Sequence, residues 1–308
     1  MNELVVAAWS MTEAAAAHLS GVSMPLLAAG LALHVLKLGA RARAWQNVLR
    51  VSFPDRCVAF RDAAIPYFAG VGAGVIVPLG GGEVLRVAIA RTRLRTDEDA
   101  ASTATIVGSL AVEKALDFVV ALLVVACAAT VGALPNGALH GRLAAGASPL
   151  VAAIVAGIVL AAALGCLYWR RPLAASARRL VRGLAVLHRP SRYLTTVASW
   201  QLLSWALRFA AIVAFLYAFH VPGALAVAPI VLLLQLLAGA IPFTPGGAGT
   251  QQALMAAALG SAAVVGFSAG TQAATMLVDL ALGTAALASC GIRPSLRILR
   301  PAAITASL

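Results

Sequence analysis

Charged residues are scarce in this chain. Only 11% of its 308 residues are charged, and 61% are hydrophobic, whereas a soluble domain carries about 25% charged residues. The mean hydropathy is +0.93. This composition excludes a soluble enzyme or binding domain and predicts an integral membrane protein. The length allows roughly six to nine spanning segments, so any chemistry takes place in the membrane or at its surface.

Cysteine and cofactor-binding patterns are also sparse. The four cysteines, Cys57, Cys127, Cys166 and Cys290, are scattered, without a CxxC pair or a Cys/His cluster. We therefore expect no structural disulfide, no metal site and no cofactor. No GxxxxGK[ST] motif for ATP is present, so transport by this chain would be passive or ion-coupled. Residues 3–20 lack a basic leader region and are expected to form an amphipathic or interfacial helix.

The positive charges are concentrated in a few segments. The chain has 23 Lys and Arg and a net charge of +12, but most of them fall between apolar runs. Because cytoplasmic loops of membrane proteins are enriched in Lys and Arg, this pattern indicates membrane topology and not nucleic-acid binding. We therefore expect membrane lipids as partners and a multi-pass protein of the cytoplasmic membrane. A homo-oligomer is left open.

The basic segments suggest an unusual path for the first apolar run. Segments 41–61 and 84–95 contain five and four arginines, and they flank the apolar run 63–79 on both sides. A re-entrant 63–79 keeps both segments on the cytoplasmic side. Run 100–133 then crosses the membrane outward, and run 148–169 crosses it back to the cytoplasmic side.

Two Gly/Pro-rich breaks interrupt the apolar runs. The first is Pro78–Glu83, and the second is Pro242–Gly249. Backbone that leaves the helix inside a membrane must be buried in protein or line a wet cavity. Paired breaks in two halves of a chain point to a transporter's binding site. The first break is expected to enter from the cytoplasm and the second from outside.

These patterns predict an all-α polytopic helix bundle with two re-entrant hairpins related as an inverted repeat. We expect one membrane domain over 1–308. Its first half is 21–169 with a break at 78–83, its cytoplasmic basic linker is 170–192, and its second half is 193–290 with a break at 242–250.

Ionisable residues inside a membrane cost about 2.5–3.5 kcal/mol each on insertion scales and are candidates for function. Glu83 and Arg86 follow the first break at i,i+3, on one helix face. With the glycines that end at Gly82, they form either an ion pair at the membrane surface or a receptor for an anionic headgroup.

A second group lies deep in run 100–133. Glu113 and Asp117 share a face at i,i+4, and Lys114 lies at i,i+3 from Asp117. Roughly 20 Å of helix separates this group from Asp99. These residues indicate a proton or ion relay, a polar substrate site, or a purely structural ion cluster.

The second half carries fewer charges. Arg208 continues a polar stripe in run 193–219, and Asp279 continues another in run 262–290. An Arg208–Asp279 pair is expected, with a structural or a functional role. The second break is uncharged, and Gln251 and Gln252 open the helix after it.

Four stretches of the chain resemble one known family, the lysylphosphatidylglycerol synthase transmembrane region, whose members are flippase-like membrane proteins. They are Arg41–Trp45, similar to the family's Arg/Trp motif; Pro78–Arg86, similar to Pro-x-x-x-Gly-Glu-x-x-Arg; Glu113–Asp117, similar to Glu-Arg-x-x-Asp; and Pro242–Gly249, similar to Pro-x-x-Pro-Gly-Gly-x-Gly. Two features depart from the family pattern. Gln252 stands where Glu is usual, and the final helix has Gln272 and Asp279 where Arg is frequent. A first membrane helix of the family is also expected to be absent.

The resemblance implies translocation of a lipid with a polar or anionic headgroup. The candidate translocation residues are Gly82, Glu83, Arg86, Glu113, Lys114, Asp117, Arg208, Pro245, Gly246, Gly247, Gly249, Gln252 and Asp279. We expect the first break and the Glu113–Asp117 group to hold the headgroup, and the second break to act as the opposing gate.

Two other classes of function stay open. One is an intramembrane enzyme, either a glycosyltransferase-like protein using Glu113 and Asp117 or a hydrolase using the GxSxG pattern at 266–270. A nucleophile elbow, however, needs a later histidine, and none follows His220. The other is a non-transporting accessory protein of envelope biogenesis. We expect the chain not to be an enzyme.

Overall fold

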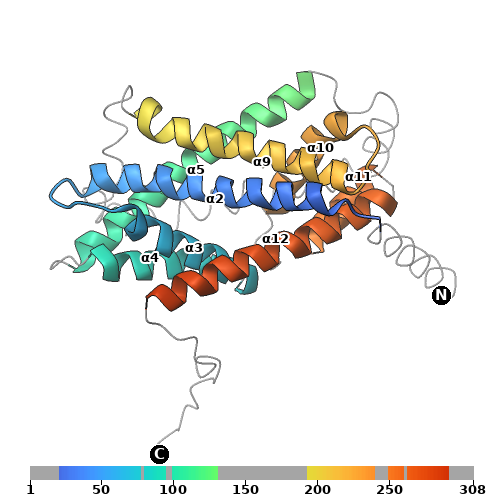
Figure 1. Ribbon diagram of the computed structural model, residues 1–308. Helices are drawn as coiled ribbons and strands as arrows, with labels where there is room; N and C mark the ends of the chain where they lie inside the picture. The colour runs from blue at the N-terminus through green and yellow to red at the C-terminus, as the bar shows by residue number, and fades with distance from the viewer. Residues whose placement is uncertain are drawn as a thin grey trace, which may run out of the picture.

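The computed structural model describes residues 21–77, 80–94, 99–130, 193–239, 249–259 and 262–290 (Figure 1). The expected interfacial helix 3–20, the crossing 148–169 and the linker 170–192 lie outside the described residues. The described chain is helical and contains no strand, which confirms the predicted all-α fold. Its elements are α2 (Met24–Ser52), α3 (Phe60–Ile76), α4 (Gly81–Leu94), α5 (Asp99–Thr130), a π-helical turn (Leu194–Ala198), α9 (Ser199–Ala218), α10 (Ala224–Gly239), α11 (Thr250–Leu259) and α12 (Ala262–Ser289).

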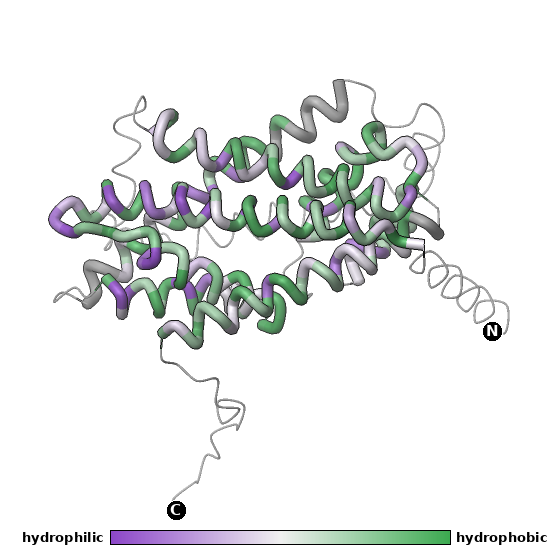
Figure 2. Tube along the Cα trace, in the orientation of Figure 1, coloured by the Kyte–Doolittle hydropathy of each residue, from purple (hydrophilic) through white to green (hydrophobic). Residues whose placement is uncertain are grey.

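Three of the described helices are long and apolar enough to cross a membrane. They are Met24–Ser52, Leu194–Ala218 and Val264–Ser289. Hydrophobic residues predominate along these helices, and a hydrophilic loop joins α2 to α3 (Figure 2). This arrangement supports a multi-pass membrane protein.

Helix α2 extends further than the charge pattern predicts. Segment 41–61 was expected to be a basic loop, but α2 continues to Ser52, so only residues 53–59 form the connection. The expectation was wrong because the chain has no Gly or Pro between Gly39 and Pro54 to end the helix. Arg41 therefore lies inside the bundle and not in a cytoplasmic loop.

Helices α2 and α9 form the central antiparallel pair of the bundle (Figure 1). The Ser23 backbone N–H donates to the Ala218 carbonyl at 2.9 Å, and Asn47 Nδ2 donates to the Thr196 carbonyl at 2.6 Å at the other end. These two bonds join both ends of the pair and set its register. Polar side chains on the facing surfaces are therefore brought together along its length.

Helices α3 and α4 form a tight antiparallel hairpin around the first break. Asp62 at the start of α3 pairs with Arg93 at the end of α4 at 3.5 Å. A Cβ added to Gly82 would lie 2.3 Å from the Gly70 carbonyl oxygen, so glycine is needed for the two backbones to approach this closely. The helices have 17 and 14 residues, fewer than the 20 or so of a full crossing. The re-entrant path of this hairpin stays a prediction.

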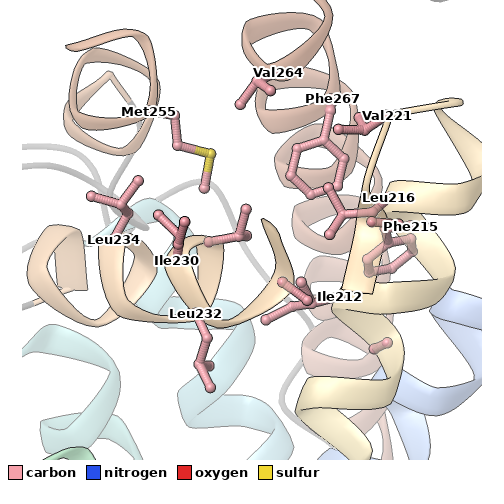
Figure 3. Packing of buried hydrophobic residues seen from close by; sticks show 14 of the residues in the cluster. Ile212, Phe215, Leu216, Val221, Ile230, Leu232, Leu234, Met255, Val264 and Phe267 are labelled. Atoms are coloured by element: carbon pink, nitrogen blue, oxygen red, sulfur yellow. The ribbon is translucent and has the colours of Figure 1, made fainter. Parts of the chain in front are cut away.

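The second break separates α10 from α11. Residues 240–248 lie outside the described residues, and among the glycines of this break only Gly249 is described, with φ +83°. Ile230 and Leu234 of α10 and Met255 of α11 pack toward Val264 and Phe267 of α12 in an apolar core (Figure 3). This core holds α10 and α11 against the α2–α9 pair.

Helices α3 and α12 pack through small residues, as is common in membranes. A Cβ on Gly72 would lie 2.7 Å from the Gly283 Cα and 2.9 Å from the Asp279 carbonyl oxygen. We expect Gly72→Ala to separate the two helices and to lower the stability by about 1–3 kcal/mol, measured as thermal unfolding in detergent.

Gly74→Ala is the matched control. Gly74 lies in the same helix, and its added Cβ would meet no atom within 4 Å. Because alanine is the better helix former by up to about 1 kcal/mol, Gly74→Ala should be neutral or stabilising. Equal losses in both variants would contradict this packing.

Candidate functional site

A column of polar side chains runs along one face of α2 through the apolar bundle. His34, Lys37, Arg41 and Trp45 lie at i, i+3, i+7 and i+11, a spacing that places them on one side of a helix. They extend over about 16 Å of helix axis, roughly half of the 30 Å hydrocarbon core. Arg41 and Trp45 of this column contact an ion network, and His34 and Lys37 line a cavity.

Glu113 of α5 is the centre of the ion network. Its Oε2 accepts from Arg86 Nη2 of α4 at 2.6 Å, and its Oε1 accepts from Arg41 Nε of α2 at 3.3 Å. Both the Glu113 and the Arg86 side chains are only 3% exposed. Arg41 also pairs with Asp117 one turn further along α5, so the predicted shared face of Glu113 and Asp117 is confirmed.

The rest of the network lies nearer the surface. Glu83 pairs with Arg86 at 3.5 Å, as the i,i+3 spacing predicts, and with Lys114 at 2.9 Å. Lys114 therefore contacts the first-break glutamate and not Asp117. We define the ion network as Arg41, Glu83, Arg86, Glu113, Lys114 and Asp117. Its three cations balance its three carboxylates.

Aromatic side chains and a serine hydroxyl group hold the network in place. The Arg86 guanidinium carbon lies 3.9 Å from the Trp45 ring centroid and 4.6 Å from that of Tyr67, both within cation–π range. Trp45 Nε1 donates to Ser109 Oγ at 2.9 Å. From α9, Trp205 Nε1 donates to Asp117 at 3.2 Å. Side chains of α2, α3 and α9 thus contact the charged groups of the network, and among its described donors the buried Arg86 Nε has no hydrogen-bond partner.

Beside the network lies a cavity of about 310 Å³. Its lining comes from α2, α3, α9, α10, α11 and α12. Val75 precedes the first break by three residues, Gly239 precedes Pro242 by three, and Gln251 follows Gly249 by two. Residues adjoining both breaks therefore line one cavity.

The charged groups of the cavity do not pair as predicted. Arg208 and Asp279 both line it, but Asp279 Oδ1 pairs with His34 Nε2 of α2 at 2.8 Å. Arg208 Nη2 donates to Gln235 Oε1 of α10 at 3.3 Å. The expected Arg208–Asp279 ion pair is thus wrong. The carboxylate instead pairs with a histidine that lies 245 positions away in the chain. The Thr271, Thr275 and Asp279 stripe does line the cavity.

Amide side chains mark the second-break end of the cavity. Gln251 Nε2 donates to Ser268 Oγ at 3.4 Å, and Gln252 Nε2 donates to Gln272 Oε1 at 2.5 Å. The Gly249 N–H donates to Gln252 Oε1 at 2.8 Å. Gln251 and Gln272 line the cavity, whereas Gln252 is not part of the lining and contacts it through Gln272. The predicted site residues Pro245, Gly246 and Gly247 lie outside the described residues.

A hydrolase site at the GxSxG pattern is disfavoured by these surroundings. Ser268 of the GxSxG pattern is fully buried within α12, whereas a nucleophile elbow lies exposed at a strand-to-helix turn. The described residues contain no group of three or more His, Cys, Asp or Glu placed to hold a metal ion.

Four important residues were not found as site residues from the sequence. His34 and Lys37 of the cavity, and Tyr67 beside Arg86, lie in apolar runs. Arg41 was assigned to a loop, although it belongs to one of the family-like stretches. His34, Lys37, Arg41 and Trp45 are separated by three or four residues, the spacing of one helix face. This signal is visible in the sequence only if the helix is extended through Arg41.

Comparison with known sequences places the chain in a family. No curated protein and no solved structure matches it. The sequence model of the family described as "Lysylphosphatidylglycerol synthase TM region" matches residues 4–290. This match covers nearly the whole chain, including the ion network, the cavity and both breaks. The chain therefore belongs to the lysylphosphatidylglycerol synthase transmembrane-region family.

Proposed function

We infer that this protein is a transporter, not an enzyme, that moves a lipid with a polar or anionic headgroup across the cytoplasmic membrane by a passive or ion-coupled mechanism. The observation that carries the proposal is the charged cavity lined by residues adjoining both breaks. Transporters place their substrate site where two interrupted segments meet. An apolar bundle that only served as a scaffold would not need to bear the insertion cost of Lys37, Arg208 and Asp279.

The ion network and the cavity have different parts in this proposal. In the network, the charges of Glu113 and Asp117 are matched by arginines, and Arg86 is covered by aromatic rings. These paired charges hold α2, α4 and α5 together. The cavity has donors that face open volume, so the headgroup would enter there while the acyl chains stay in the lipid.

The same contacts weigh against the glycosyltransferase-like alternative. A catalytic carboxylate must be free to exchange a proton or to contact the substrate. Glu113 uses both of its oxygens for arginines, and Asp117 accepts from Arg41 and from Trp205. These contacts favour a structural role for the two carboxylates.

A reconstitution experiment tests the proposal. The purified full chain is placed in vesicles of phosphatidylethanolamine and phosphatidylglycerol that carry a trace of fluorescent phosphatidylglycerol, and dithionite is added outside. We expect label from the inner leaflet to become reducible faster than in protein-free vesicles. Recovery of unmodified lipid by thin-layer chromatography would support transport. A protein-free rate in vesicles containing folded protein, or a chemically modified lipid, would contradict it.

A further inference from the structure

The cavity carries an excess of positive charge, unlike the ion network. Among the residues that line it, Lys37 and Arg208 are cations and Asp279 is the one carboxylate. With a neutral His34, these groups give the cavity a net charge of +1. An unbalanced cation within an apolar bundle is costly, and a bound anion would offset that cost.

Both cations keep donors for a ligand. Lys37 Nζ contacts a neutral group, His34 Nδ1, at 3.2 Å, and Arg208 Nη2 contacts another, Gln235 Oε1, at 3.3 Å. Within the described part of the chain, neither cation has a carboxylate oxygen within 4.0 Å. Lysine offers three donors and arginine five, so most of their hydrogen-bonding capacity is available.

The size and the amides of the cavity narrow the ligand. About 310 Å³ is at the small end of ligand pockets, so the cavity takes a headgroup fragment and not acyl chains. Gln235, Gln251 and Gln272 line the wall and add neutral donors and acceptors. Asp279 would repel a second negative charge on the ligand, because like charges in a low-dielectric site interact strongly.

We propose that this cavity binds the phosphate group of a singly charged phosphodiester between Lys37 of α2 and Arg208 of α9. Planar guanidinium and flexible ammonium groups are the usual protein donors to phosphate. This proposal rests on the inferred transport of lipid headgroups. It adds that the headgroup is negatively charged and that Lys37 and Arg208 bind its phosphate. Asp279, held by His34, limits binding to monoanions.

Binding is measured on the purified full chain in a non-ionic detergent, as the rise in unfolding temperature with ligand. The probes are dihexanoyl phosphatidylglycerol, inorganic phosphate and phosphate-free dihexanoylglycerol. We expect Lys37→Gln and Arg208→Gln each to weaken binding by about tenfold or more, the scale of one charge-assisted hydrogen bond. Arg208→Lys keeps the charge and should lose less. Arg61→Gln removes one cation from the exposed start of α3 and should leave binding unchanged.

Asp279→Asn gives the sharpest result because the expected effect has the opposite sign. Asparagine can still accept from His34, but it removes the carboxylate that repels the anion. Tighter binding to Asp279→Asn, with weaker binding to Lys37→Gln, supports an anion site. Weaker binding to Asp279→Asn, or equal binding to Lys37→Gln, Arg208→Gln and wild type, would overturn it.

The three probes distinguish the source of the phosphate. A shift with the lipid, with or without a shift with inorganic phosphate, supports a phosphodiester headgroup. A shift with inorganic phosphate alone would overturn the phosphodiester assignment. Shifts with all three probes or with none would overturn the proposal. Vesicles that translocate lipid while folded protein binds neither phosphate probe would leave the transport proposal standing. Binding without translocation would contradict transport only.

Discussion

Glu113→Gln is expected to destabilise the protein more than a typical substitution of a polar residue. The change leaves Arg86, which is 3% exposed, without its closest carboxylate. Arg86 cannot turn toward water, because Trp45 and Tyr67 lie against its guanidinium. Breaking a buried ion pair by removing one partner costs about 3–5 kcal/mol. The unfolding temperature in detergent should therefore fall by on the order of ten degrees.

Glu83→Gln is the matched control. Glu83 also pairs with Arg86, at 3.5 Å, but its side chain is 40% exposed. Exposed ion pairs contribute at most about 1 kcal/mol, so this variant should unfold within a few degrees of the wild type. Equal losses in the two variants would show that burial does not determine the strength of the network.

A double substitution separates the lost ion pair from general damage. In Arg86→Met with Glu113→Gln, no buried cation remains at position 86, and Arg41 keeps Asp117. Because the double variant removes the buried charge that Glu113→Gln leaves without its closest carboxylate, it should be more stable than Glu113→Gln alone. A double variant less stable than the single one would contradict the explanation that the buried Arg86 charge causes the loss.

The network illustrates what the sequence could predict. The i,i+4 spacing of Glu113 and Asp117 and the i,i+3 spacing of Glu83 and Arg86 describe positions on one helix, which local geometry determines. Apolar runs likewise predicted the helices, because an apolar segment enters the membrane and must then satisfy its backbone hydrogen bonds by forming a helix. The contact between Arg86 and Glu113 joins two such helices, and both residues were already candidates as costly charges.

Long-range pairings could not be predicted in the same way. Asp279 was expected to meet Arg208 because both lie in the second half, but His34 of the first half takes its place. The close approach of α3 and α12 at Gly72 and Gly283 is a result of tertiary packing that no local pattern indicates. Arg41 was misassigned for another reason, since arginine occurs both in cytoplasmic loops and in buried pairs.

Thr275→Phe is expected to stop lipid translocation without unfolding the protein. Thr275 lines the cavity from α12, and an aromatic ring at this position would occupy the volume that a headgroup needs. No charge changes, so Lys37, Arg208 and Asp279 stay in place. Filling a cavity often stabilises a protein, so the unfolding temperature should stay near or above that of the wild type, while dithionite reduction falls to the protein-free rate.

Thr284→Phe is the matched control, because the two threonines have the same local chemistry. Thr275 Oγ1 donates to the carbonyl four residues earlier at 2.9 Å, and Thr284 Oγ1 does the same at 2.9 Å. Thr284, however, is exposed on the outer side of α12. Its substitution by Phe should therefore leave translocation unchanged.

A graded series distinguishes lost volume from the lost hydroxyl group. Thr275→Val keeps the shape and removes the hydroxyl, whereas Thr275→Leu and Thr275→Phe add increasing bulk. If the headgroup passes through the cavity, translocation should be nearly normal in Val, lower in Leu and absent in Phe. Folded Thr275→Phe protein that translocates lipid at the wild-type rate would show that the headgroup takes another route. Equal losses in all three variants would instead point to the hydroxyl group and not to the space it borders.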